Sequence, residues 1–409
     1  MPLRLPILWR DNLLSTAVSS PRSEITEIPA GAGTNLMPRR MHESYAQVTL
    51  PFASDPHLLD SYTNANGGIR TGKIMEHLDS LAGSVAYKHA LGPAVESLGS
   101  IILEGFYFVT ASIDRLDMLQ PLTPQDTSDL RISGQVIFVG ASSMEVAIKL
   151  ESVNETTGEE KTVMIGEFSM VCRDAVTHKA QKLNPLILET ETERELFHIG
   201  KVGKERKKKI SLLSLSRSPP CEDESSLIHS LFVVHQPFTD SKGRPLETTP
   251  MGNTMLESTA LMHPQDRNFH TTDDFSGYLM RLAYEIGYST ATLFANRPLR
   301  FFSLDNTTFK LPVPVGSILR LQSKVTHTKS GAANFRSDRH ASLVNVRVQA
   351  DVLDVKTGDK KTTNEFQFTW GDDHTLHKTV IPVTYIEAME WLEGRRALDV
   401  GDQIRKFRS

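Results

Sequence analysis

Residues 63–83 read TNANGGIRTGKIMEHLDSLAG, and residues 268–287 read NFHTTDDFSGYLMRLAYEIG. Each stretch is a loop that contains asparagine, followed by a glycine and then by apolar residues at helical spacing. Gly277 follows Gly72 by 205 residues. Because the same order of loop, glycine and helix occurs twice, the two stretches indicate a repeated unit.

A second pair of markers lies further along each copy. The turn sequence at residues 157–161 is matched by the one at residues 357–361, 200 residues later. Two markers at nearly the same offset predict a duplicated domain. The copies differ at one polar position, since the residue seven places after the glycine is Asp79 in the first copy and Tyr284 in the second. This difference predicts a site that the two halves share unequally.

The composition is ordinary for a globular protein. The 409 residues are 39% hydrophobic and 23% charged, with a formal net charge of −4, which gives no global attraction to nucleic acid or acidic lipid. The two cysteines, Cys172 and Cys221, exclude a disulfide framework and a four-cysteine metal site. No apolar run approaches 18 residues, so we expect no membrane-spanning helix.

Both copies predict a long helix followed by antiparallel strands. In the first copy the helix has its apolar stripe at Ile74, Leu78, Leu81 and Val85, and the second has its helix at about 276–296. Runs rich in β-branched and aromatic residues follow each helix, at 100–114, 131–140, 143–151 and 162–173 in the first copy and at 300–311, 317–327, 343–354 and 361–371 in the second. The expected fold class is α+β, with each helix wrapped by a curled antiparallel sheet.

The domain division follows from the repeat. We expect a disordered or targeting segment, a first domain, a linker, a second domain and a tail, at residues 1–45, 46–174, 175–230, 231–395 and 396–409. The first 22 residues hold three arginines and one acid, a weak transit-peptide pattern for which a disordered N-terminus is an equal alternative. The basic run 204–209 could bind nucleic acid, but aromatic residues do not interleave with it, so we favour a solvated linker with short helices.

Asp79 is the first candidate for chemistry. It lies about 130° from the centre of the apolar stripe of its helix, which is typical of a solvated surface acid. If the two repeated helices pair, however, the face opposite the sheet becomes a cleft between domains. A carboxylate there can act as a general base for water.

The loops before the helices supply the other candidates. Asn64, Asn66 and Asn268 can cap helices or close turns, or they can orient a carbonyl or a water. Gly72 and Gly277 stand at or near the helix N-termini, where unpaired N–H groups can stabilise an oxyanion. No serine-hydrolase elbow, zinc-protease motif, Cys-x-x-Cys pair or dinucleotide fingerprint occurs, and we expect neither a metal nor a cofactor.

Several stretches together resemble the duplicated, mitochondrial-type hotdog-fold acyl-CoA thioesterases of eukaryotes, over residues 40–395. They are residues 41–45, 72–81, 142–146, 263–268, 277–285 and 382–385. The resemblance implies two tandem hotdog domains and hydrolysis of fatty acyl-CoA by a water molecule, with coenzyme A as part of the substrate. It also implies a mitochondrial matrix location, or otherwise a cytoplasmic one, and a homo-oligomer such as a trimer of double hotdogs.

The resemblance also assigns roles to residues. The working site pairs an asparagine of one domain with a helix carboxylate of the other, here Asn268 with Asp79. The reciprocal site would pair Asn64 with the second helix, where Tyr284 takes the aspartate position and Glu285 is adjacent. The family commonly has Phe-Gly-Gly before the second helix, whereas this chain has Phe-Ser-Gly at residues 275–277.

The coenzyme phosphates require cations near the cleft. The candidates are Lys73, Arg281, Arg297 and Arg300.

Two other functions remain open at this point. A hydratase of enoyl-CoA on the same fold needs an aspartate and a histidine close together in one loop, and residues 268–270 match that poorly. A non-catalytic acyl-CoA sensor would have no need of a general base, which disfavours it because both Asp79 and Asn268 are present.

Overall fold

The computed structural model describes residues 36–93, 105–120, 122, 128–154, 158–212, 214–215, 217–233, 246–266, 276–330 and 342–408. Most of the expected targeting segment, and also Asn268, lie outside the described residues. Residues 39–44, at the end of that segment, form the short strand β1 (Arg39–Arg40) and the 3-10 helix η1 (Met41–Ser44), in which Met41 and Ser44 are buried.

The first module is a long helix on an antiparallel sheet. Helix α3 (Thr71–Leu91) follows a short helix, α2 (Pro56–Ser61), and packs on the inner face of the sheet. The strands of this module are β2 (Ala46–Leu50), β3 (Phe106–Met118), β4 (Asp129–Val139), β5 (Ser143–Asn154) and β6 (Glu159–Asp174).

The second module repeats this order. Helix α6 (Ser276–Ala295) packs on the second half of the sheet. The remaining elements are β8 (Glu247–Pro250), η3 (Met251–Thr254), β9 (Leu256–Leu261), η4 (Pro264–Asp266), β10 (Arg300–Phe309), β11 (Ile318–Ser330), β12 (Ser342–Leu353), β13 (Lys360–Asp372) and β14 (Lys378–Ile381).

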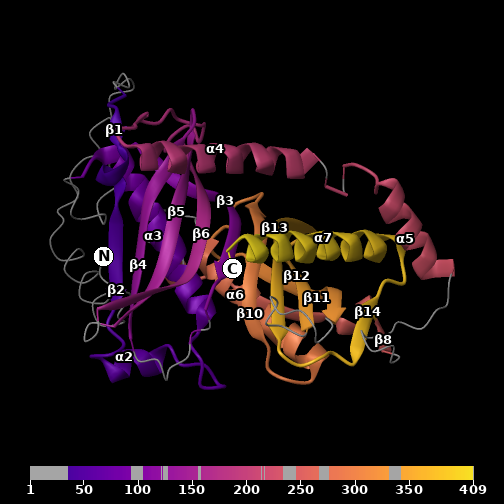
Figure 1. The fold of residues 1–409 in the computed structure, drawn as a ribbon. Coiled ribbons are helices and arrows are strands. Elements are labelled where there is room, and N and C mark those ends of the chain that lie inside the picture. Colours follow the sequence, from indigo (N-terminus) through magenta and orange to yellow (C-terminus); the bar gives the residue numbers. More distant parts are fainter. Residues whose placement is uncertain are drawn as a thin grey trace.

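The two half-sheets join into one sheet of ten strands in the order β2-β4-β5-β6-β3-β10-β13-β12-β11-β9 (Figure 1). The junction is the antiparallel pair β3–β10. This arrangement confirms the expected α+β class and the tandem duplication. The strand bounds differ from those expected by a few residues, most of all for β3, which continues to Met118.

Matching irregularities support the duplication. The pairing of β5 with β6 shifts register after Leu150, and that of β12 with β13 shifts after Ala350, 200 residues later. The turns that follow also match, since Gly158 and Gly358 have φ angles of 68° and 75°. These positive angles favour glycine, as the sequence predicted for both turns.

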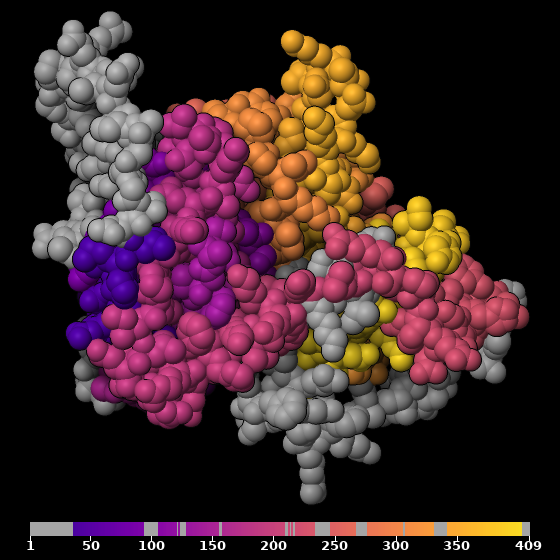
Figure 2. Space-filling view, turned by 90° about the horizontal axis from the view of Figure 1, so that it is seen from above, coloured from indigo at the N-terminus to yellow at the C-terminus, as the bar shows by residue number. Residues whose placement is uncertain are grey.

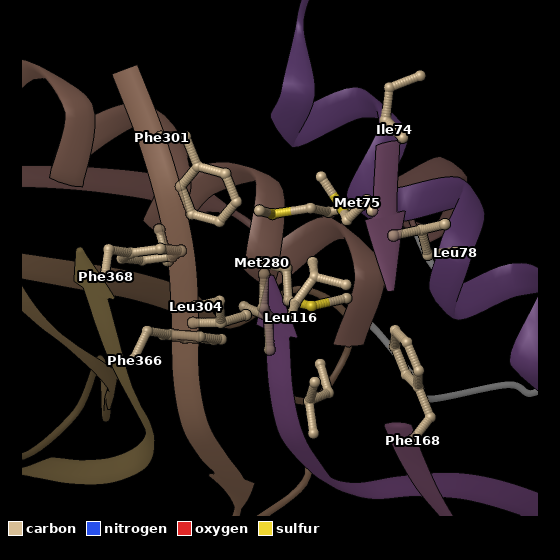
Figure 3. Close-up of a cluster of buried hydrophobic side chains, with 14 of the residues drawn as sticks. Ile74, Met75, Leu78, Leu116, Phe168, Met280, Phe301, Leu304, Phe366 and Phe368 are labelled. Atoms are coloured by element: carbon tan, nitrogen blue, oxygen red, sulfur yellow. The ribbon is translucent and has the colours of Figure 1, made fainter. Parts of the chain in front are cut away.

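The core lies between the sheet and helices α3 and α6. The expected stripe of Ile74, Leu78, Leu81 and Val85 is buried against the sheet. Figure 3 shows apolar side chains of both modules gathered into one cluster, with Met75 of α3 and Met280 of α6 between them. Both methionines are fully buried, so the seam between the modules is part of a continuous core.

The segment expected to be a solvated linker is largely helical. Helix α4 (Glu191–Leu212) follows the short strand β7 (Leu186–Ile187) and packs on β4, and Gly200 contacts Ile137 and Phe138 closely. Figure 2 shows residues 191–233 as a pink band across the molecular surface from module one toward α7. The expectation of short helices was wrong because small residues of α4, such as Gly200, let it pack closely on the outer face of the sheet.

Part of the basic run is not solvated but faces the sheet. The Lys207 ammonium lies 3.1 Å from Asp114 Oδ1, 2.8 Å from Glu145 Oε2 and 2.5 Å from Ser169 Oγ. Side chains alternate between the two faces of a strand, so these polar residues face α4 while their neighbours face α3. Lys207 therefore donates to the buried polar groups of the sheet, while burial lowers its pKa to about 7 and raises the pKa of Glu145 to about 7.

Module two has a corresponding outer helix, α7 (Tyr385–Arg408), on β11 and β12. This helix is continuous across residue 395, where we expected the tail to begin. Its charges are the reverse of those on α4: Glu390 pairs with Lys324 at 2.5 Å and with Arg347 at 2.6 Å, so that the acid is on the helix and the bases are on the sheet.

Helix α5 (Glu222–Val233) connects the outer helices. Glu224 and Arg396 of α7 form a two-pronged ion pair with distances of 2.6 and 2.7 Å. The hydrogen bonds from Arg396 lower the pKa of Glu224 to about 2. The segment between the modules is thereby attached to both of them.

A buried histidine under α7 leads to a prediction about pH. Burial lowers the pKa of His327, whose ring lies 4.3 Å from that of Trp391, to about 3. The unfolded chain binds a proton near pH 6.5 that the folded protein does not, so the free energy of unfolding falls as the pH drops from about 6.5 toward 3. We expect a His327→Gln variant to lose roughly 1 kcal/mol less per pH unit than the parent between pH 6 and 4, measured by urea unfolding. Equal slopes for both proteins would contradict this assignment.

Candidate active site

Helices α3 and α6 cross at their N-terminal ends. A Cβ added to Gly72 would lie 3.2 Å from side-chain carbons of Arg281 and Tyr284, four and seven residues after Gly277. A Cβ added to Gly277 would lie 3.2 Å from Glu76 and Asp79, four and seven residues after Gly72. The two contacts are therefore mirror copies, and the glycines allow the antiparallel helices to approach closely.

Asp79 lies in this seam and not on the surface. Its side chain is only 1% exposed, which corrects the reading of a solvated acid. Asp79 does lie away from the stripe of α3 that faces the sheet, as the helical wheel indicates. The face of α3 that carries Asp79 packs on α6, however, and not against solvent. The structure thus brings Asp79 to the junction of the two modules.

Two hydroxyl groups hold the Asp79 carboxylate. Thr110 of β3 donates to Oδ1 at 2.8 Å, and Ser276 of α6 donates to Oδ2 at 2.6 Å. Both residues are buried. Sequence reasoning missed Thr110 because a polar residue within an apolar strand does not reveal its partner, and it treated Ser276 only as a variation in the loop.

The mirror contact around Gly72 is called the second seam here, and the contact around Gly277 the first. In the second seam the residue that corresponds to Asp79 is the aromatic Tyr284. Thr110 pairs with Met170 in the first half-sheet, and Phe301 pairs with Trp370 in the second, so the duplication aligns Thr110 with Phe301. Tyr284 has its ring centroid 5.5 Å from that of Phe301 and 4.9 Å from that of Trp370. Burial raises the pKa of the Tyr284 phenol above its usual range, so it remains protonated at neutral pH.

The comparisons with known proteins agree with this architecture. The chain is 33% identical over 393 residues to a bovine protein named acyl-coenzyme A thioesterase 9, mitochondrial, which covers 95% of this chain and 84% of the relative. The chain belongs to the acyl-coenzyme A thioesterase family. A mouse acyl-coenzyme A thioesterase 10, mitochondrial, is 34% identical over 88% of the chain and 78% of its own length. No family model matches the sequence.

Solved thioesterase structures align with one module or with both. A hexameric acyl-CoA thioesterase is 28% identical, with 43% of this chain and 99% of that chain covered and a TM-score of 0.36. A Lactobacillus plantarum protein named as an oleoyl thioesterase is 12% identical, with 81% and 96% covered and a TM-score of 0.46. Both modules of the present thioesterase-family chain are hotdog domains, each with a long helix on an antiparallel sheet.

The candidates for a second site are engaged elsewhere in this family member. The Asn64 side-chain oxygen accepts from the N–H groups of Asn66 and Gly68, both at 2.9 Å, and its amide donates to the Ile69 carbonyl at 3.3 Å. Asn64 therefore closes its own loop, as the turn interpretation predicted. Glu285 is 47% exposed and lies 3.1 Å from Arg70.

The neighbouring Asn66 bridges the modules. Its amide donates to the Tyr288 hydroxyl of α6 at 2.6 Å. This contact attaches the loop before α3 to the second module. The hydrogen bonds of Asn64, in contrast, stay within the loop.

The four candidate cations fall into two groups. Lys73 and Arg281 lie near the seam: the Lys73 ammonium is 3.9 Å from the Tyr62 ring centroid, and Arg281 pairs with Glu76 at 3.1 Å. Arg297 and Arg300 lie beyond the other end of α6, a helix about 30 Å long, and pair with Asp372 and Asp373. The structure does not bring the second group to Asp79.

Among the residues that the structure describes, no group of three or more His, Cys, Asp or Glu side chains could hold a metal ion. Within the same residues no helix is long and apolar enough to cross a membrane.

Proposed function

We propose that this chain hydrolyses fatty acyl-CoA to a free fatty acid and coenzyme A, with Asp79 as the general base that activates water. The observation that carries the proposal is the placement of the buried Asp79 carboxylate beside the N-terminus of the opposing helix α6. A base that activates water and a helix N-terminus that stabilises the developing oxyanion are suited to thioester hydrolysis.

In the proposed reaction, the water oxygen attacks the thioester carbonyl carbon while Asp79 takes the water proton. The negative charge that develops on the carbonyl oxygen is stabilised by N–H groups at the α6 N-terminus, around Gly277. When the intermediate collapses, the carbon–sulfur bond breaks and the thiolate receives the proton from Asp79. Asn268, eight residues before the first residue of α6 in the sequence, is proposed to orient the water or the carbonyl.

We propose one working site in each chain. Asp79 and Thr110 in the first seam correspond to Tyr284 and Phe301 in the second, so the second seam lacks the carboxylate and the hydroxyl that corresponds to Thr110. Glu285, which is exposed and ion-paired with Arg70, is a poor substitute. We propose that the second seam, with Tyr284 and Phe301, contributes to folding and not to catalytic turnover.

The ion pairs of the four candidate cations also indicate which of them could bind the phosphates of coenzyme A. Lys73 is the better phosphate candidate at the seam, because Arg281 already pairs with Glu76. Arg297 and Arg300 pair with acids beyond the C-terminal end of α6. They could bind the coenzyme phosphates only if the substrate extended along the whole helix from Asp79.

Location and assembly are parts of the same proposal. The bovine, human and mouse relatives are named as mitochondrial proteins, which supports a mitochondrial location for this chain. Within the mitochondrion we propose the matrix, and the cytoplasm is the alternative location. A related thioesterase structure is described as hexameric, which supports a homo-oligomer such as three double-hotdog chains.

The function is tested by following thiol release from a series of acyl-CoA substrates of increasing chain length. Release above the rate without protein supports the enzyme, and the best chain length identifies its substrate class. Tight binding of acyl-CoA with no release would favour the non-catalytic sensor instead. Loss of enoyl absorbance without thiol release would identify a hydratase.

We expect hydrolysis to need no added metal. Carboxylate, amide and helix N-terminus supply the chemistry, so turnover measured after dialysis against a chelator should equal that before it within about twofold. The control is a zinc-dependent hydrolase treated in parallel. Complete loss of activity that a divalent ion restores would refute this prediction.

A further inference from the structure

The first residue of α6 reaches the carboxylate of the other module. Ser276 Oγ donates to Asp79 Oδ2 at 2.6 Å, and each side chain is 1% exposed. We infer that Ser276 is a positioning residue, which module two contributes to fix the Asp79 carboxylate of module one. This inference rests on the proposed function of Asp79 as the base.

The geometry separates the two hydroxyl partners. Thr110 occupies Oδ1 from the same module, and Ser276 occupies Oδ2 from the opposite one. A donor on each oxygen fixes the rotation of the carboxylate plane. A Cβ added to the adjacent Gly277 would lie 3.2 Å from Asp79 Oδ2, so this glycine presents no side chain to the carboxylate, whereas Ser276 donates to it.

The hydroxyl also affects the charge of the base. A donor to a carboxylate stabilises the ionised form and lowers its pKa. Besides Asp79, the ionisable side chains at this end of the two helices include Lys73, Glu76, which is paired with Arg281 at 3.1 Å, and Glu285, which is paired with Arg70. On the sheet, the acids Asp114 and Glu145 face α4 on the outer side.

The other seam provides a matched control. Thr71 stands at the start of α3 as Ser276 stands at the start of α6, and it forms a hydrogen bond with Tyr284, the counterpart of Asp79. Removing either hydroxyl changes the first residue of a helix, at the corresponding position of its own seam. Only removal at Ser276 changes a partner of the base.

The experiment compares S276A, S276T and T71A in kcat and KM for an acyl-CoA substrate from pH 4 to 9. We expect S276A to raise the pKa of the acid limb of kcat/KM by about one unit and to lower kcat about tenfold, with KM within about twofold. S276T restores the hydroxyl and should restore both values. T71A should leave the acid limb in place.

Two results overturn the inference. An acid limb that stays in place in S276A, or one that shifts equally in T71A, reduces Ser276 to a structural residue. If S276A does not fold, S276G provides a second variant without the hydroxyl. Loss of activity in D79N with an unmoved acid limb in S276A rejects this inference alone, whereas full activity in D79N rejects the proposed function as well.

Discussion

Replacing Asp79 with asparagine should lower turnover of acyl-CoA by about 10²–10⁴-fold, the usual contribution of a general base. Asparagine has the shape of aspartate but cannot take a proton from water at neutral pH. One of the hydroxyls of Thr110 and Ser276 that now donate to the carboxylate can go on donating to the amide oxygen, and the other can rotate to accept from the amide N–H, so the seam should stay closed. Turnover is measured by thiol release and folding by thermal unfolding.

Asp79→Ala is the matched variant for stability. It removes the acceptor and leaves two buried hydroxyls without their present partner, so the free energy of unfolding should fall by about 1–3 kcal/mol for each. We therefore expect the asparagine variant to be folded and inactive, and the alanine variant to be less stable and inactive. An active, folded Asp79→Asn protein would exclude Asp79 as the base.

Replacing Asn268 with alanine should lower turnover by about 10²–10³-fold, the effect of losing one donor aimed at the reacting carbonyl. Replacing Asn64 should instead affect folding, because its side chain makes three hydrogen bonds within its own loop. The expected cost of Asn64→Ala is about 1–3 kcal/mol with nearly normal kcat in the folded protein.

The two asparagine variants are measured together with Glu285→Gln. Glu285 is half exposed and paired with Arg70, so its loss should change kcat by less than about twofold. Equal losses of turnover in all three variants would mean that both seams are active. That result would refute the single working site while leaving the thioesterase function intact.

Local patterns made the repeated core predictable from the sequence. The stripe from Ile74 to Val85 follows from spacing within one helix, and its residues are buried in the structure. The turns at Gly158 and Gly358 follow from short local sequences, and both glycines have positive φ angles. The meeting of Asp79 with the second module was hypothesised from the duplication. Its burial was not predicted, because a helical wheel cannot reveal that a helix has two packing faces.

The outer helices were not predicted for a related reason. The basic residues around Lys207 are typical of solvated chain, and only the acids Asp114 and Glu145, 93 and 62 residues earlier, explain why one of them is buried. Such long-range complementarity has no local signature. The same limit applies to Thr110 and Ser276, which are ordinary residues in sequence and meet only at Asp79.

The reversed charges of the two outer helices have a consequence for how the chain assembles. After a gene duplication, two similar sheets and two similar covering helices can pair in the wrong combination, within one chain or between two. In the strand registers, Lys324 and Arg347 of module two correspond to Gln135 and Ala147 of module one, so Glu390 of α7 would find no base at the matching place on the other half-sheet. A buried carboxylate without a positive partner is strongly unfavourable. The charge pattern therefore favours α7 on its own half of the sheet.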